Sequence, residues 1–219
     1  MDMVTGFFEY LWAVRTEMAL LTVQHLLLST VAIFCGAMIA IPGGIFISRY
    51  PSLGMPLLDV TGILYTIPSL ALLGFLIPFL GLGIMTTVVA LTLYSLLPLL
   101  RNTYVGIKEV DVFIKEAAIG MGSTRNQLLW KVELPLALPF IMAGLRTVTV
   151  MTVGITTLGA LVGAGGLGVL IFRGMHMLDS NMLLAGTLPV AAMAIVFDNL
   201  LAFAEQKIRQ FMGILDTNK

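Results

Sequence analysis

The longest uncharged stretch of the chain limits its fold more than any other feature. Between Asp59 and Arg101 lie 41 residues without an aspartate, glutamate, lysine or arginine. A helix of about 20 apolar residues crosses the roughly 30 Å hydrocarbon core of a bilayer, so this stretch is too long for a single crossing. It has a natural break at Gly81-Leu82-Gly83. We therefore expect two membrane-spanning helices joined by a tight turn.

Composition extends this conclusion to the whole chain. Of the 219 residues, 58% are hydrophobic and 11% are charged, whereas a soluble domain carries about 25% charged residues. We predict an all-α polytopic membrane protein with a single domain over residues 1–219. Its five transmembrane helices are expected at residues 24–47, 57–80, 83–102, 138–161 and 182–204.

Two segments outside these spans have a different character. Residues 1–21 mix aromatic and charged side chains, which is typical of an amphipathic helix lying on the membrane surface. The stretch from Gly163 to Asn181 begins with a glycine-rich run. We expect it to be an irregular connection to the fifth span.

The basic residues indicate which way the chain faces. Five spans put the two ends of the chain on opposite sides of the membrane. With residues 104–135 inside, nine lysines and arginines fall in inside segments and two, Arg15 and Arg173, in outside segments. Because basic residues are enriched on the cytoplasmic side, we expect the N-terminus outside and the C-terminus in the cytoplasm.

One long polar segment, Lys115 to Pro135, interrupts the apolar sequence. It opens with helix-forming residues, breaks at Gly120 and Gly122, and restarts where Ser123 or Thr124 caps a second short helix that ends before Pro135. A compact helical hairpin outside the bilayer offers a docking element to another protein.

The spacing within this segment resembles the EAA loop of ABC importer permeases. Glu116-Ala117-Ala118 is followed after three residues by Gly122, and after nine more by Val132-Glu133-Leu134-Pro135. The resemblance implies a type I ABC importer permease fold, with a coupling-helix hairpin within residues 104–135 that docks on a cytoplasmic ATPase. The residues that it implies for coupling are Glu116, Ala117, Ala118, Gly122, Leu134 and Pro135.

Further segments are similar to the osmoprotectant branch of that family, which takes up glycine betaine, carnitine or choline. They are Leu97 to Tyr104, Val132 to Ala137, Ile141 to Thr147, Gly163 to Gly168 and Ile171 to Gly174. The resemblance implies a bacterial plasma-membrane protein. Its implied partners are a second permease subunit, identical or paralogous, two ATPase subunits that carry ATP and Mg, and an extracellular substrate-binding protein. The methionine branch shares the EAA and GAGGLG elements, so a methionine or other amino-acid importer is an alternative.

Nothing in the sequence indicates catalysis by this chain. It lacks the GxxxxGK[ST] loop that cradles nucleotide phosphates, so a separate chain must hydrolyse ATP. Gly163 to Gly168 fits GxGxxG, but a membrane helix precedes it instead of a strand, and we exclude a dinucleotide site. His25 and His176 stand alone, so we expect no metal or cofactor. The formal net charge of zero gives no sign of nucleic-acid binding.

Polar residues inside the spans are candidates for a gate or a transport path, although helix packing explains many such residues equally well. Tyr65 and Ser69 share a polar helix face with a kink at Pro68, and Arg146 is a costly intramembrane charge that should face Asp59 or Asp198. The candidates within the spans are Tyr65, Ser69, Tyr94, Thr152 and Thr156. The resemblance to the permease family adds Gly163, Gly165, Gly166 and Gly168, since it implies that this glycine run is a flexible element near the gate.

A different class of protein is also compatible with five spans. The chain could form one half of an inverted-repeat secondary transporter driven by an ion gradient. That interpretation predicts a coupling-ion site at a broken helix. It gives no role to the polar hairpin.

Overall fold

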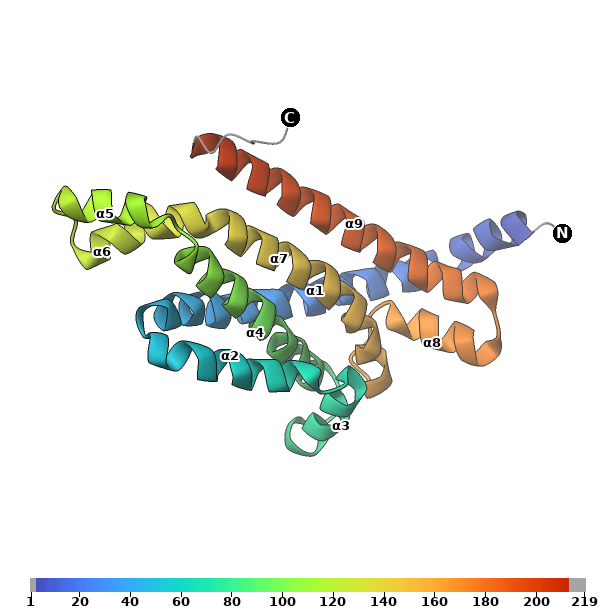
Figure 1. The fold of residues 1–219 in the computed structure, drawn as a ribbon. Coiled ribbons are helices and arrows are strands. Elements are labelled where there is room, and N and C mark those ends of the chain that lie inside the picture. Colours follow the sequence, from blue (N-terminus) through green and yellow to red (C-terminus); the bar gives the residue numbers. More distant parts are fainter. Residues whose placement is uncertain (1–2, 213–219) are drawn as a thin grey trace.

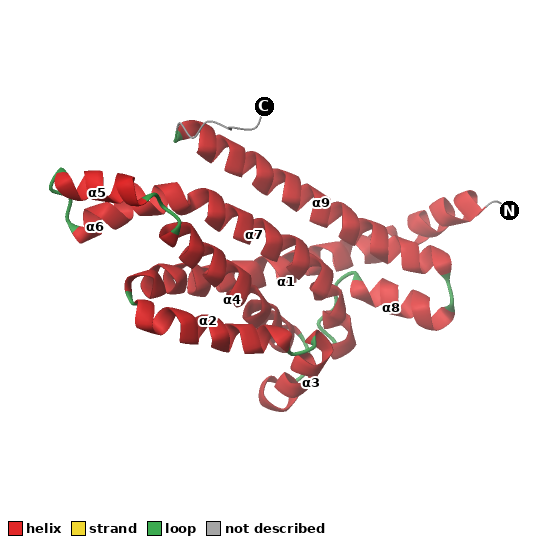
Figure 2. Cartoon of the chain, viewed as in Figure 1, coloured by secondary structure: helices red, strands yellow, loops and turns green. Residues whose placement is uncertain are grey.

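The structure, a computed structural model, describes residues 3–212, and the regular elements in that range are helices (Figure 1, Figure 2). A π-helical turn, Leu129–Glu133, joins α6 to α7, and a 3-10 helix, Thr157–Val162, follows α7. The α-helices are α1 (Met3–Arg49), α2 (Pro51–Thr66), α3 (Ser69–Leu80), α4 (Ile84–Lys108), α5 (Val112–Gly120), α6 (Arg125–Leu128), α7 (Leu134–Thr156), α8 (Gly168–Met177) and α9 (Ser180–Phe211).

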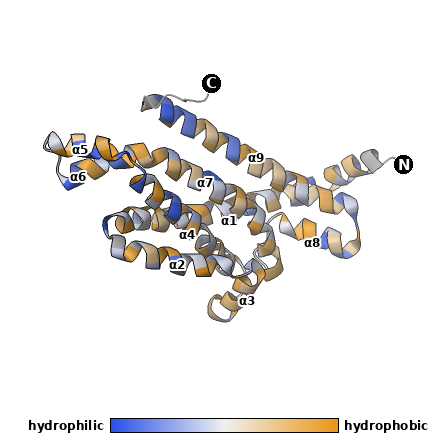
Figure 3. Cartoon of the chain, viewed as in Figure 1, coloured by the Kyte–Doolittle hydropathy of each residue, from blue (hydrophilic) through white to orange (hydrophobic). Residues whose placement is uncertain are grey.

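Four helical stretches are long and apolar enough to cross a membrane, and α2 with α3 makes a fifth crossing if the pair counts as one span. Polar residues gather at the α5–α6 end, along the C-terminal part of α9 and at the α8–α9 turn, with apolar residues between them (Figure 3). The predicted fold class, an all-α polytopic membrane protein with a helical hairpin, is confirmed, with four or five crossings depending on how the bent pair is counted. The four stretches are Gly6–Arg49, Ile84–Lys108, Arg125–Val162 and Ser180–Gln210.

The expected span at residues 57–80 is two helices and not one. α2 and α3 are bent by 96° relative to each other at Ile67 and Pro68. Pro68 lacks a backbone N–H, and its ring forces Ile67 into an extended conformation with φ −65° and ψ 127°. The sequence predicted a kink here, and the proline produces a complete break.

α1 is longer than expected, because it runs without interruption from Met3 to Arg49. The separate surface helix predicted for residues 1–21 is therefore wrong within the described range. No proline precedes Pro42, so nothing stops the helix. At 1.5 Å per residue it is about 70 Å long, and its N-terminal end projects beyond the α8–α9 turn (Figure 1). An ion pair of 2.9 Å between Glu17 and Arg173 holds this end against α8.

The connection expected to be irregular contains a helix, α8. Gly168 and Gly174 lower the helix propensity of this segment, which is why the sequence pattern gave no helix. Gly174 instead allows close packing, since a Cβ there would lie 2.6 Å from the backbone nitrogen of Leu183 on α9. Tertiary contact with α9 therefore outweighs the weak local propensity.

The centre of the molecule is the contact between α1, α4 and α7. Glycines of α1 allow close packing on α4: a Cβ at Gly36 would lie 1.7 Å from Ser95 Oγ, and one at Gly44 would lie 2.6 Å from Thr103 Cβ. A Cβ at Gly144 of α7 would lie 2.8 Å from Asn102 Cβ of α4. A buried cluster fills the space between the three helices, formed by Ala40, Ile47, Leu99, Leu100 and Val148.

Replacing Gly44 with valine tests the close packing of α1 on α4. The added side chain meets Thr103 and the Leu100 carbonyl, and overpacking of this kind costs about 1–3 kcal/mol. We expect a lower midpoint of thermal unfolding in detergent, with size-exclusion chromatography used to monitor the loss of folded protein. Gly74→Ala is the control, because a Cβ at Gly74 meets nothing within 4 Å. Equal midpoints for the two variants would contradict the packing model.

Candidate functional site

The polar hairpin consists of α5 and α6, joined by a turn whose geometry the sequence explains. Asp111 caps α5 by accepting a 2.8 Å hydrogen bond from the Phe113 N–H. Gly122 takes a left-handed conformation with φ +86° in the turn. Thr124 and Gln127 then form a capping box at the start of α6, with hydrogen bonds of 3.3 and 2.9 Å. Of the two expected caps, Thr124 is the one that acts.

Polar contacts fasten the base of the hairpin to the rest of the molecule. The Lys115 ammonium group donates to the carbonyls of Ile107 and Lys108 at the end of α4, at 3.3 and 3.2 Å. Arg49, the last residue of α1, forms an ion pair with Glu133, which is 5% exposed. The hairpin is therefore tied to both α4 and α1.

The second half of the hairpin continues directly into α7. The expectation that it ends before Pro135 is wrong, because α6, the π-helical turn and α7 form one unbroken run. The wider π turn lies immediately before Leu134 and Pro135, where it accommodates a residue that has no N–H to donate. The hairpin and α7 thus form one continuous helical element.

Three of the six coupling candidates lie on the open side of the hairpin. Glu116, Ala117 and Gly122 are exposed, whereas Ala118 is buried. Leu134 and Pro135 are half-buried in the first turn of α7 and lie apart from that surface. Among the described residues, the Glu116 side chain has no hydrogen-bond partner or ion pair.

Apolar side chains also project from this polar hairpin. Phe113 is 79% exposed, Met121 is 82% exposed and Ile119 is 56% exposed. Exposed large apolar side chains on a polar element are typical of a protein interface. The hairpin therefore combines exposed apolar side chains with the free carboxylate of Glu116.

The glycine-rich run after α7 forms a turn with three left-handed glycines, at which φ is 80–82°. Gly163 ends the 3-10 helix, and Gly165 and Gly166 follow it. The Gly166 N–H donates to the Gln24 Oε1 of α1 at 3.1 Å. Gly168 begins α8, where a Cβ would lie 1.9 Å from the Thr157 carbonyl oxygen. The run is a tightly packed turn that is bonded to α1.

Two residues that the sequence analysis did not assign to the site, Gln24 and His25, hold this turn and α7 in place. His25 is fully buried, and its Nε2 lies 2.9 Å from the Val153 carbonyl of α7. Its Nδ1 has no hydrogen-bond partner among the described residues. The sequence feature that could have identified them is the occurrence of two adjacent polar residues inside an apolar run.

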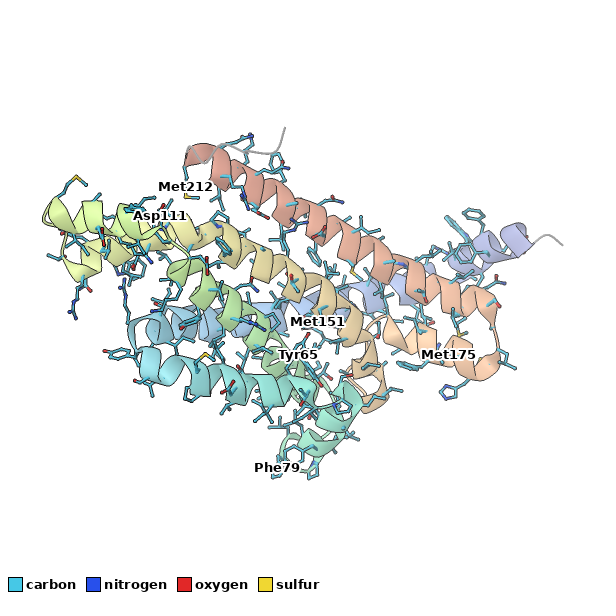
Figure 4. All side chains as sticks on the ribbon, in the orientation of Figure 1. Tyr65, Phe79, Asp111, Met151, Met175 and Met212 are labelled. Carbon is cyan, nitrogen blue, oxygen red and sulfur yellow. The ribbon has the colours of Figure 1, made fainter. Side chains whose placement is uncertain are left out.

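The aromatic candidates come together where α2 bends into α3. The rings of Tyr65 and Tyr94 lie 5.9 Å apart at an angle of 66°. The Tyr94 hydroxyl donates to the Ile67 carbonyl, and the Tyr65 hydroxyl donates to Met151 Sδ at 3.2 Å (Figure 4). Ser69 begins α3 at the same bend.

The threonine candidates on α7 are buried in the interior. Thr152 and Thr156 are almost fully enclosed, and the Thr156 hydroxyl donates to the Thr152 carbonyl at 2.7 Å. In this conformation they pack between helices and do not line an open groove.

The intramembrane charges separate into two places. Arg146 on α7 makes a two-point contact with Asp198 on α9, at 2.9 and 3.1 Å, and also reaches Glu205 at 3.3 Å. Glu205 in turn pairs with Arg209. Asp59 lies on α2 and forms no ion pair with Arg146. Among residues 3–212, no group of three histidine, cysteine, aspartate or glutamate side chains is arranged to hold a metal ion.

Comparisons with known proteins agree with this geometry. A family model described as "binding-protein-dependent transport system inner membrane component" matches residues 26–210. The choline transport system permease protein of Bacillus subtilis is 41% identical and covers 88% of each chain. The carnitine transport permease protein of Listeria monocytogenes is also 41% identical, over 85% of this chain and 86% of its own.

A third relative and a solved structure extend the comparison. The glycine betaine/carnitine/choline transport system permease protein of Bacillus subtilis is 44% identical, over 84% of this chain and 81% of its own. A chain in an inward-facing structure of the MetNI methionine ABC transporter matches with a TM-score of 0.74 and 24% identity, over 96% of this chain and 98% of that chain. The structural likeness supports the fold alone.

Replacing Arg49 with methionine tests the attachment of the hairpin. The change leaves the buried Glu133 carboxylate unpaired, and breaking a buried ion pair from one side costs about 3–5 kcal/mol. Since a third of the Arg49 side chain is exposed, we expect a loss near the lower end of that range. The measurement is the thermal unfolding midpoint of the purified chain. The double variant Arg49→Met, Glu133→Leu should recover most of the loss, and a purely additive double variant would contradict a direct interaction.

Proposed function

This chain belongs to the family of binding-protein-dependent transport system inner membrane components, and we propose that it is the permease subunit of an ABC importer for quaternary ammonium osmoprotectants, namely glycine betaine, carnitine or choline. Two observations together support the proposal. Relatives of 41–44% identity bear these substrates in their names, and the chain has an exposed hairpin suited to coupling. The methionine alternative and the gradient-driven alternative have no comparable support.

In this proposal the hairpin binds a separate cytoplasmic ATPase. Phe113, Ile119 and Met121 supply the apolar contact, and Glu116 supplies a carboxylate for a basic or N–H donor of the partner. ATP and Mg bind to the ATPase, so this chain performs no hydrolysis. The coupling loop at residues 104–135 and the C-terminus lie in the cytoplasm of a bacterial cell, and the N-terminus lies outside.

The attachment of the hairpin gives the mechanism of transmission. Nucleotide-driven movement of the ATPase displaces the hairpin, which is continuous with α7 and bonded to α1 and α4. The three central helices then move together, and α7 carries the displacement to the glycine turn that Gln24 holds. Such rocking alternates access between the two sides of the membrane.

The exposed surfaces of the chain support two further partners. α2 and α3 contact few other helices, and their exposed apolar side chains need a neighbour. We propose that a second permease subunit, identical or paralogous, covers them and completes the path. A substrate-binding protein delivers the solute at the opposite end from the hairpin, beside α8 and the N-terminal part of α1.

The variant Glu116→Lys tests the coupling role. We expect the substitution to reverse the charge at the docking surface and to abolish the ATPase stimulation that a loaded binding protein produces in lipid vesicles. Glu9→Lys carries the same change at the exposed, opposite end of the molecule and should leave coupling intact. Full stimulation in Glu116→Lys would contradict the assignment.

A further inference from the structure

A groove of about 560 Å³ lies between α2 and α4. Asp59, Gly62 and Thr66 line it from α2 at spacings of three and four residues, which places them on one helix face. Leu97 and Arg101 line it from α4, one turn apart. The groove is large enough for a small organic solute, and it contains one anionic and one cationic side chain.

Asp59 and Arg101 face this common space without neutralising each other. Both are exposed, and within the described residues neither forms an ion pair or a side-chain hydrogen bond. By contrast, Arg146 and Asp198 are fully engaged with each other between α7 and α9. Both residues lie at the inside ends of the expected spans 57–80 and 83–102, within reach of a hydrated solute. Two unengaged charges of opposite sign across one groove match a ligand that carries both signs.

Charged side chains, and not aromatic ones, give the groove its chemistry. Asp59 lies on its α2 side and Arg101 on its α4 side. Tyr65 and Tyr94 do not line it: the Tyr65 hydroxyl contacts Met151 of α7, and Tyr94 is 6% exposed. The groove thus offers a carboxylate to a cation and a guanidinium group to an anion.

We propose that this groove is a substrate site within the permease itself, for a small solute that carries a quaternary ammonium group. Asp59 faces the ammonium group, and Arg101 binds a carboxylate where the solute has one, because a guanidinium group matches a carboxylate at two points. This inference rests on the proposed function and adds a site to it. Asp59 sets affinity for all such solutes, whereas Arg101 distinguishes betaines from choline.

The position of the site fits a step late in import. Arg101 lies seven residues before Lys108, the end of α4 that leads into the hairpin, so it is about 10 Å from that end at 1.5 Å per residue. α4 is also the helix whose terminal carbonyls bind Lys115. A displacement of the hairpin therefore reaches this wall of the groove directly.

The test is ATP-driven uptake by the assembled importer, with its ATPase and binding protein, in vesicles of phosphatidylglycerol and cardiolipin. Radiolabelled glycine betaine, carnitine and choline are compared for the wild type, Asp59→Asn, Arg101→Gln and Arg101→Lys. Lys207→Gln is the control, because it removes a basic residue on α9 outside the groove. Co-purification with the ATPase and unchanged basal hydrolysis establish that each variant is folded and assembled.

The expected pattern separates the two charges. Arg101→Gln should lower glycine betaine and carnitine uptake by about tenfold or more relative to choline, as expected for the loss of a charged hydrogen bond. Arg101→Lys should retain part of the glycine betaine and carnitine uptake. Asp59→Asn should lower uptake of all three solutes. Equal losses for betaine and choline in Arg101→Gln, unchanged uptake in Asp59→Asn, or a wild type that carries only choline would overturn the site.

Two controls separate this inference from its alternatives. Uptake of none of the three solutes by the wild type would contradict the proposed function, whereas normal wild-type uptake with indifferent variants contradicts the groove site alone. A zwitterionic lipid headgroup has similar chemistry. Native mass spectrometry that finds phosphatidylethanolamine retained by the wild type, absent from Asp59→Asn and not displaced by excess glycine betaine would assign the groove to lipid and overturn the substrate site.

Discussion

The close contact of α1, α4 and α7 is the constraint on which the rest of the structure depends. In a bilayer, lipid chains are as apolar as leucine, so helices associate through close packing and hydrogen bonds. Gly36 and Gly44 on α1 and Gly144 on α7 allow that approach to α4. Each central helix then holds one part of the hairpin: α1 through Arg49, α4 through its last carbonyls, and α7 by direct continuation.

Much of the fold could be predicted from the sequence, because the bilayer imposes a length on every crossing. The uncharged runs indicated where the chain can cross the membrane, and Gly122 and Thr124 indicated the turn and cap of the hairpin. The sequence-based predictions were wrong where tertiary packing or backbone geometry outweighed local sequence preferences. Pro68 broke a helix that was expected only to kink, while a π turn carried the chain past Pro135 without a break. α8 formed despite two glycines, because Gly174 packs on α9.

Local features of the candidate site could likewise be predicted from the sequence, whereas its long-range contacts could not. The spacing from Glu116 to Gly122 was visible in the sequence, and the structure places both residues on the open face of the hairpin. Contacts between distant residues were not visible. Arg49 pairs with Glu133, 84 positions away, and Gln24 meets Gly166 across 142 positions. Arg146 was expected to face Asp59 or Asp198. The structure shows that it pairs with Asp198 and Glu205, because α9 packs on α7.

The central claim is that the hairpin is the contact through which an ATPase moves the central helices. A photoreactive amino acid in place of Met121, an exposed residue of the hairpin turn, tests it most directly in whole cells. Leu178, 91% exposed at the α8–α9 turn, is the matched position at the other end of the molecule (Figure 1). The account predicts crosslinks from position 121 to a cytoplasmic ATPase subunit and none to it from position 178. Crosslinks to the ATPase from position 178 alone would contradict both the docking surface and the orientation of the chain.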